Sequence, residues 1–317
     1  HTAQRIICVD NEAPDLEASS TKQASGDTGE REGGGGCGAG GYVTSYRQQL
    51  SILTKRAFLS RKGHSTDRLF VFTVLAISVL SAALWWQRGG NGSDVLSEKD
   101  VQDISGCLFF QGIFWSFQIM FQALLTFPME RDIMQKERAV GLYHLSSFYI
   151  GKTLADTGLI VVMPVICAPI YYFSCGLRPA GFPAHLALLL LNAVTAQSWG
   201  LLFGCVFMDT KHATVFQSVF MLATMLTGGF YVRNQLVYLQ WIEYFSFSKY
   251  VYTAMAKIEF TSTRRFKCDG GLCDVSDAPS LAALDMSGTS MFEAVGVIIM
   301  WGIVARVIGY FALKIRK

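Results

Sequence analysis

Charged residues are scarce in this sequence of 317 residues, at 16% of the total, whereas apolar residues make up 51%. Soluble domains carry about a quarter charged residues, so this composition indicates an integral membrane protein in contact with lipids. The mean hydropathy of +0.33 agrees with that class. The net charge of +3 is too small to predict a nucleic acid as a partner.

The sequence also lacks recognisable catalytic or metal-binding arrangements. The apolar runs hold no Ser-His-Asp set, no paired carboxylates and no His/Cys cluster with ligand spacing. Gly151-Lys152-Thr153 looks like the end of a phosphate-binding loop, but Ser146 stands where that motif requires its first glycine. We therefore expect no catalytic residue, no metal site and no cofactor bound by this chain itself.

Residues 1–41 have few large apolar side chains and end in a glycine-rich run at 33–41. Such a segment cannot bury enough surface to offset the entropy lost on ordering, so it is predicted to be a disordered linker. It also contains no apolar core of a cleavable signal peptide.

Residues 42–68 are predicted to form an amphipathic connecting helix. Leu50, Leu53 and Ala57 recur with helical spacing on one side. Basic residues, among them Arg56, occupy other positions, which suits a helix on the cytoplasmic surface of a membrane. An ordinary helix of a soluble domain is the alternative.

Six apolar segments each have close to the roughly 20 residues that a helix needs to cross a bilayer. The predicted fold is therefore an all-α integral membrane domain over residues 69–317. Its six spans are expected at about 69–87, 104–127, 150–173, 184–208, 213–232 and 291–313.

Basic residues precede the first span, follow the last and lie between spans two and three. The positive-inside rule makes this side cytoplasmic, so both termini are predicted to be cytoplasmic in a multi-pass protein of the plasma membrane. The loop at 233–290 is then extracellular. Its aromatic first part, 241–260, is predicted to be a re-entrant helix, since charges such as Glu243 and Lys249 make a full span costly.

A dense polar block lies between spans two and three. No glycine or proline interrupts residues 129–140, so a cytoplasmic coupling helix is predicted there. Its charged side chains are predicted to receive motion from a partner domain, and an ion-pair cluster within the membrane domain is the alternative. The coupling residues are Glu130, Arg131, Glu137 and Arg138.

Two features fall in the predicted extracellular loops. Asn91, followed by Gly92 and Ser93, has the pattern of an N-glycosylation acceptor, with its occupancy left open. Cys268 and Cys273 are predicted to form a disulfide, because disulfides persist in an oxidising environment. Free thiols, or pairing between subunits, are the alternatives.

Several motifs, in a fixed order, resemble the G subfamily of ATP-binding cassette transporters, and most of all its half-size plant-type members. The resemblance covers residues 42–317 and implies a transmembrane domain of the ABC-2 type. The motifs include Phe127-Pro-Met-Glu-Arg131, Lys136-Glu-Arg-Ala139, Tyr143-His-Leu-Ser-Ser147, Gly151-Lys-Thr-Leu-Ala-Asp156 and Gly228-Gly-Phe-Tyr-Val232.

The resemblance implies one half of an ATP-driven exporter of lipid-like or amphipathic small molecules. ATP and Mg²⁺ would be bound by a nucleotide-binding domain, but this chain has no Walker motif or signature sequence. The implied partners are that domain, a second half-transporter in a homo- or heterodimer, and a hydrophobic small-molecule substrate. The alternative is a motor-less membrane scaffold or regulatory subunit that dimerises with intact half-transporters.

The resemblance also implies a substrate path at the twofold interface. Spans two and five would line it, and two bulky residues after span five would match the extracellular plug of the subfamily. Filling the bundle core, or facing lipid, is the alternative for the path residues. The path residues are Phe114, Phe117, Leu222 and Met225, and the plug residues are Phe230 and Tyr231.

Overall fold

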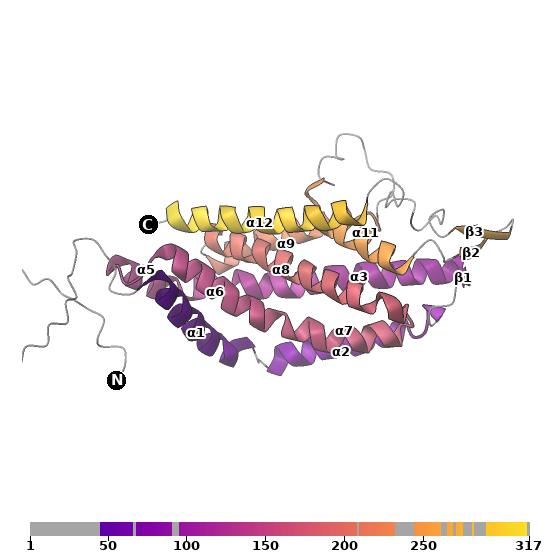
Figure 1. The fold of residues 1–317 in the computed structure, drawn as a ribbon, viewed down its shortest axis with the longest axis horizontal. Helices are drawn as coiled ribbons and strands as arrows, with labels where there is room; N and C mark the ends of the chain where they lie inside the picture. Colours follow the sequence, from indigo (N-terminus) through magenta and orange to yellow (C-terminus); the bar gives the residue numbers. More distant parts are fainter. Residues whose placement is uncertain are drawn as a thin grey trace, which may run out of the picture.

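The computed structural model describes residues 45–65, 68–90, 95–207, 209–231, 244–260, 265–268, 271–274, 281 and 290–315. Over these residues the chain is a bundle of long helices that run side by side, with a small sheet at one end (Figure 1). The predicted linker at 1–41 and the glycosylation acceptor Asn91 lie outside the described residues, so both stay predictions.

The long helices fall where the spans are predicted, and the all-helical membrane fold is confirmed. Four stretches are long and apolar enough to cross a membrane: Glu98–Pro128, Leu145–Ser174, Pro179–Phe207 and Met291–Ile315. Two further apolar helices, α2 and α9, have 17 residues each, so the number of spans stays a prediction. The bundle consists of α2 (Arg68–Leu84), α3 (Glu98–Leu124), α6 (Leu145–Ile160), α7 (Val162–Ser174), α8 (Phe182–Phe207), α9 (Thr210–Leu226) and α12 (Met291–Ile315).

The third predicted span is interrupted at Val161, between α6 and α7. Pro164 stands in the first turn of α7 and has no N–H to donate to the carbonyl of Ile160, which explains the break. Proline is tolerated in that first turn, so α7 continues the direction of α6. Together the two helices still form one apolar stretch from Leu145 to Ser174.

The centre of the bundle is a tight contact between α3 and α8. A Cβ atom at Gly200 would overlap the backbone carbonyl of Met120, and one at Gly204 would overlap that of Leu124. Only glycine therefore allows the two backbones to come so close. On α12, Gly302 lies against Thr195 of α8 in a looser contact, where an added Cβ atom would come within 3.2 Å of the Thr195 hydroxyl.

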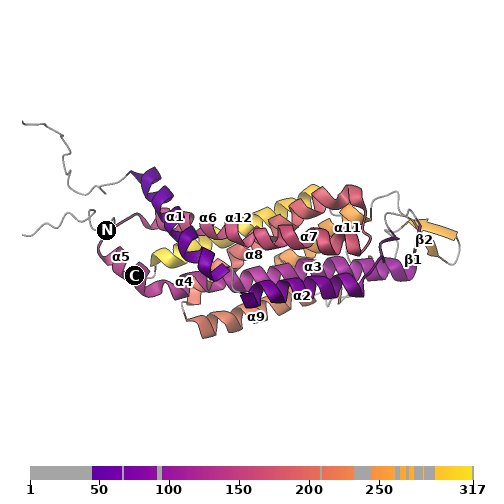
Figure 2. The ribbon, with the colours of Figure 1, turned by 90° about the horizontal axis from the view of Figure 1, so that it is seen from below.

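One end of the bundle holds the short polar helices (Figure 1). The helix predicted within residues 129–140 is present as α5, and the short helix α4 precedes it, with a turn at Glu130 between them. α1 packs against α6 through the buried residues Leu53 and Ala57, and it crosses the end of the bundle at an angle (Figure 2). The elements at this end are α1 (Tyr46–Ser65), α4 (Thr126–Met129) and α5 (Arg131–Ala139).

The other end carries the sheet and a short buried helix. The first strand pairs in parallel with the second, which pairs antiparallel with the third, and Phe266 lies between Leu96 and Cys273 in the register. The short helix packs against α3, α8 and α12, in the position of the predicted re-entrant helix. These elements are β1 (Val95–Ser97), β2 (Arg265–Cys268), β3 (Gly271–Asp274), the 3-10 turn η2 (Pro179–Gly181) and α11 (Phe247–Glu259).

Cys273 of β3 is disulfide-bonded. The side chain of Cys268 lies outside the described residues, so the predicted pairing of these two cysteines stays a prediction. Their positions suit it, because Cys268 and Cys273 lie on the two strands of one antiparallel hairpin.

Candidate functional site

An aromatic cleft with a volume of about 580 Å³ opens between α2, α3 and the end of α9. This size lies within the range of small-molecule sites, which is roughly 300–1,000 Å³. Three of its lining residues carry polar groups, the amide of Gln118, the hydroxyl of Tyr231 and the indole N–H of Trp85, and the others are apolar. The lining consists of Ile77, Trp85, Gly106, Phe109, Phe110, Ile113, Phe114, Phe117, Gln118, Met225, Phe230 and Tyr231.

The wall of the cleft on α3 is built from stacked rings. Phe110 and Phe114 are nearly parallel, with centroids 5.9 Å apart, and Trp85, directly after α2, approaches Phe110 at 5.6 Å. Phe110 and Phe114 are four residues apart on α3, so they share one face of the helix. The cleft therefore presents flat apolar surfaces rather than a uniform aliphatic lining.

Phe230 closes one end of the cleft by stacking on Phe109, with centroids 4.9 Å apart and the ring planes 14° apart. Two glycines after α9 make this contact possible. Gly229 has a φ of +84°, which turns the chain back towards α3. A Cβ atom at Gly228 would come within 2.8 Å of the Phe109 ring, so a larger residue would displace that ring.

Five of the six residues predicted for the substrate path and plug line this one cleft. Leu222 is the exception: it lies on α9 with 48% of its surface exposed and does not contribute to the lining. The sequence interpretation did not select Phe109 or Trp85, although Phe109 belongs to the same aromatic run on α3. The aromatic residues themselves were visible in the sequence. The segments that bring them together, at the ends of α9 and α2, follow only from the fold.

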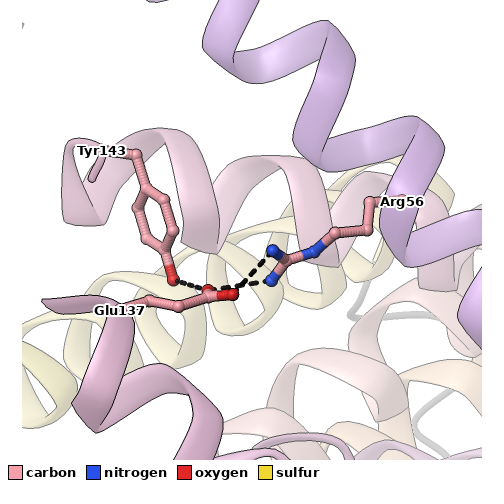
Figure 3. A network of polar contacts seen from close by, with 3 residues as sticks. All are labelled: Arg56, Glu137 and Tyr143. Carbon is pink, nitrogen blue, oxygen red and sulfur yellow. Dashed lines mark hydrogen bonds and ion pairs between the residues drawn. The ribbon is translucent and has the colours of Figure 1, made fainter. Parts of the chain in front are cut away.

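A second candidate region lies at the polar end, where Glu137 of α5 meets Arg56 of α1 (Figure 3). The Arg56 guanidinium donates two hydrogen bonds to the two carboxylate oxygens, at 2.7 and 2.9 Å. The Tyr143 hydroxyl donates a third, at 2.6 Å to Oε2. We call these three residues the α1–α5 cluster.

The cluster favours the charged form of Glu137. Burial by itself raises the pKa of this carboxyl group, but hydrogen bonds from Arg56 and Tyr143 outweigh burial and hold the pKa below its ordinary value. Its carboxylate in turn raises the pKa of Arg56. Burial, followed by the same carboxylate, raises the pKa of Tyr143. At neutral pH the cluster is therefore an intact ion pair with an extra neutral donor.

A second ion pair joins Glu130 to Lys152, the first residue lying between α4 and α5 and the second on α6. The Lys152 side chain is only 3% exposed, whereas that of Arg56 is 50% exposed. Both ion pairs line a cleft of about 280 Å³ between α1, α5 and α6, together with the apolar residues Leu53, Ala57, Ile133 and Phe148 and the hydroxyl of Ser60.

The four predicted coupling residues thus divide into two groups. Glu130 and Glu137 form ion pairs within the domain, which is the arrangement that the sequence interpretation kept as its alternative. The side chains of Arg131 and Arg138 lie outside the described residues. Whether any of the four contacts a partner domain stays a prediction. Within the described residues, no group of three His, Cys, Asp or Glu could hold a metal ion.

Comparison with known proteins identifies the family. Residues 48–260 match the model of the ABC-2 type transporter family. This chain belongs to that family. It is 36% identical over 276 residues to ABC transporter G family member 21 of Arabidopsis thaliana, which covers 86% of the chain and 40% of the relative.

Other relatives agree with this membership. ABC transporter G family member 25 of Arabidopsis thaliana is 34% identical over 284 residues, covering 86% of the chain and 42% of the relative. Protein white of Drosophila melanogaster is 28% identical over 232 residues, covering 70% and 33%. The resemblance to the G subfamily is therefore confirmed, and the chain spans about two fifths of the length of the first relatives it matches.

Proposed function

We propose that this chain is the transmembrane half of an ATP-driven exporter of lipid-like or amphipathic small molecules. The observation that carries the proposal is the aromatic cleft in a domain of the ABC-2 transporter family. Stacked rings suit flat apolar molecules, and Gln118 and Tyr231 offer hydrogen bonds to one polar group of such a molecule.

The cleft would be half of a substrate path that a second half-transporter completes. It opens on the side formed by α2, α3 and α9, and Leu222 is exposed beside it on α9. A homo- or heterodimer would place two such clefts opposite one another. Leu222 would then contact either the partner or the substrate, and Phe230 with Tyr231 would separate the path from the exterior.

The chemical energy would come from a nucleotide-binding domain that binds ATP and Mg²⁺. The polar end suits reception of its movement, because α1 and α5 are joined there by the α1–α5 cluster, α1 packs on α6, and Met134 of α5 lies in a buried cluster with Phe148 of α6. In this view Glu130, Arg131, Glu137 and Arg138 act together as a coupling surface. Two of them act through the ion pairs that hold α5 in place.

Transport assays on the protein with a nucleotide-binding domain joined to this chain test the proposal. Vesicles would be loaded with one of three probes that differ in polarity and size: pyrene, rhodamine 123 or cholesterol. We expect ATP-dependent movement of at least one probe and its loss in the Phe114→Ala and Phe117→Ala variants. If ATP moves none of the three probes and the chain nevertheless dimerises with an intact half-transporter, the scaffold function is supported instead.

The orientation is a proposal as well: the α1–α5 end in the cytoplasm, the sheet outside, in the plasma membrane. Basic residues at the first end, such as Lys55, Arg56 and Lys314, support it. Protease added to sealed right-side-out vesicles should cleave near 264–267 and leave both termini intact. Removal of both termini from outside would reverse the orientation. A mass shift on glycosidase treatment, lost in Asn91→Gln, would establish the glycan at Asn91.

A further inference from the structure

Two cysteine side chains meet in the interior of the bundle, close to the end that carries the sheet. Cys107 belongs to α3, and Cys175 follows α7 directly. Their Sγ atoms lie 3.5 Å apart, in hydrogen-bond contact between two thiols. The exposed fractions are 2% for Cys107 and 1% for Cys175, so neither thiol faces lipid or water.

The backbone of Cys175 is fixed at this place by the end of α7. Gly176 has a φ of +72°, and the Leu177 N–H donates to the carbonyl of Tyr172, which is the pattern of a helix terminated by a left-handed glycine. The Gly89 N–H, after α2, donates to the carbonyl of Cys175 at 2.8 Å. These backbone hydrogen bonds fix the position of Cys175, and its side chain points at α3.

The surroundings of this pair are oxidising. Cys273 of β3 is disulfide-bonded, and β3 lies at the same end of the bundle as the turn between α7 and α8 (Figure 1). Disulfides form and persist in oxidising compartments and are rare where thiols are kept reduced. The two thiols therefore fold at the side of the membrane on which disulfide-forming enzymes operate.

We propose that Cys107 and Cys175 form a disulfide that joins α3 to the turn between α7 and α8. Their Sγ atoms have to approach from 3.5 Å to about 2.05 Å, the length of a disulfide bond. Two thiols become one disulfide, and the two electrons and two protons pass to the disulfide of a protein oxidoreductase, which leaves as a dithiol. The step takes place while the helices assemble, because packing later excludes the enzyme.

The bond would fix the wall of the aromatic cleft at one end. Phe109 and Phe110 follow Cys107 within one turn of α3, and both line the cleft. A link at Cys107 would hold this turn of α3 against the end of α7, to which the segment after α2 is also hydrogen-bonded, and would leave the wall at the end of α9 untied. The inference depends on the oxidised state of Cys273 and not on the proposed transport function.

Differential labelling tests the bond on the wild-type protein. Cells would be treated with N-ethylmaleimide, the protein denatured in the same reagent, then reduced and labelled with deuterated N-ethylmaleimide. We expect the deuterated label on Cys107, Cys175 and Cys273, and the ordinary label on Cys167 and Cys205, which are buried free thiols. The ordinary label on Cys107 and Cys175 would overturn the proposal, whatever Cys273 carries.

Variants establish which cysteines pair. Cys175→Ser should transfer Cys107 to the ordinary label, whereas the control Cys167→Ser should leave Cys107 and Cys175 with the deuterated one. Continued deuterated labelling of Cys107 in Cys175→Ser would mean another partner and would overturn the proposal. Reduction should lower the midpoint of thermal unfolding of the wild type by several degrees more than that of the double variant Cys107→Ser/Cys175→Ser, since the bond closes a long loop.

Discussion

Arg56 and Glu137 lie 81 positions apart in the sequence, yet their side chains form a two-pronged ion pair between α1 and α5. The pairing uses the planar guanidinium against both carboxylate oxygens, which a lysine cannot reproduce. Tyr143 adds a hydrogen bond to the same carboxylate, at Oε2. This contact ties the helix that precedes the first span to the helix between spans two and three.

Breaking this pair should affect coupling more than folding. Because Arg56 is half exposed, a double-mutant cycle with Arg56→Ala and Glu137→Ala should give an interaction energy of only about 0.5–1 kcal/mol in thermal unfolding. In the protein with its nucleotide-binding domain, each variant should lower substrate-stimulated ATPase activity at normal expression. Lys136→Ala, on the same helix and exposed, is the control. Equal loss of expression and activity would show a purely structural role.

The contribution of Glu137 should depend on pH. Its pKa is lower in the folded protein than its ordinary value of about 4.3, so its stabilising effect is complete above that pH and is lost as the pH falls through the folded pKa. The difference in unfolding midpoint between wild type and Glu137→Gln should therefore be the same at about pH 7 and pH 5.5, and should shrink below about pH 4. A difference that grows on acidification would contradict the arrangement.

Removing Glu130 should cost more stability than removing Glu137. Glu130→Ala leaves the ammonium of Lys152 buried without its carboxylate, at a cost of about 3 kcal/mol, whereas Glu137→Ala leaves a half-exposed arginine that water can solvate. Chemical or thermal unfolding in detergent measures the difference. Combining Glu130→Ala with Lys152→Met should recover part of the loss, because the buried charge is then gone. No recovery would mean that Lys152 is not desolvated.

Gly228→Ala should damage the cleft without unfolding the bundle. The added methyl group would lie within 2.8 Å of the Phe109 ring and would push apart the stacked pair of Phe109 and Phe230. We expect weaker transport of rhodamine 123 at near-normal expression. Gly296→Ala is the matched control, since a Cβ atom there meets nothing within 4 Å and should be neutral or slightly stabilising. Equal transport of rhodamine 123 by both variants would show that the stacking of Phe109 and Phe230 does not contribute to transport.

Phe117 of α3 and Phe127 of α4 provide a test that separates a cleft residue from a core residue. Phe127 is 1% exposed, so Phe127→Ala should lower the free energy of unfolding by about 3–5 kcal/mol. Phe117 lines the cleft, and Phe117→Ala should instead raise the apparent Kd of a bound probe roughly tenfold, for a loss of about 1.4 kcal/mol. A large loss of stability with unchanged probe binding in Phe117→Ala would remove this residue from the site.

The positions of the long helices could be predicted because lipid exposure demands uninterrupted apolar runs. The break at Val161 was less evident, although Pro164 was visible, because a proline in a membrane helix can also be accommodated by a kink. The division of the polar block into α4 and α5 at Glu130 had no such marker. Glu130 turns towards Lys152 of α6, and that partner follows only from the packing of the helices.

The aromatic cleft could be predicted only in part, because its lining also depends on how the helices pack. The spacing of Phe114 and Phe117 placed both on one face of α3, and both line one cleft in the structure, whereas their role in a substrate path stays a prediction. The same spacing joined Leu222 to Met225 on α9, but Leu222 lies too far around the helix to reach the cleft. Periodicity assigns residues to a face, and only the neighbouring helices decide how far along that face a cavity extends.

The glycine contacts between α3 and α8 determine which parts of the domain can move. At Gly200 and Gly204 the two backbones meet without intervening side chains, so sliding or rotation of one helix against the other would bring backbone carbonyls into collision. This pair is therefore a fixed reference within the half-transporter. The segment after α2 is also held in place, because Gln87 and Gly89 donate backbone hydrogen bonds to the end of α7. The end of α9 differs, since it meets α3 through the side chains of Phe230 and Phe109. The walls of the cleft are therefore unequal: α3 keeps its position against α8, and a change in the width of the cleft requires displacement of the end of α9.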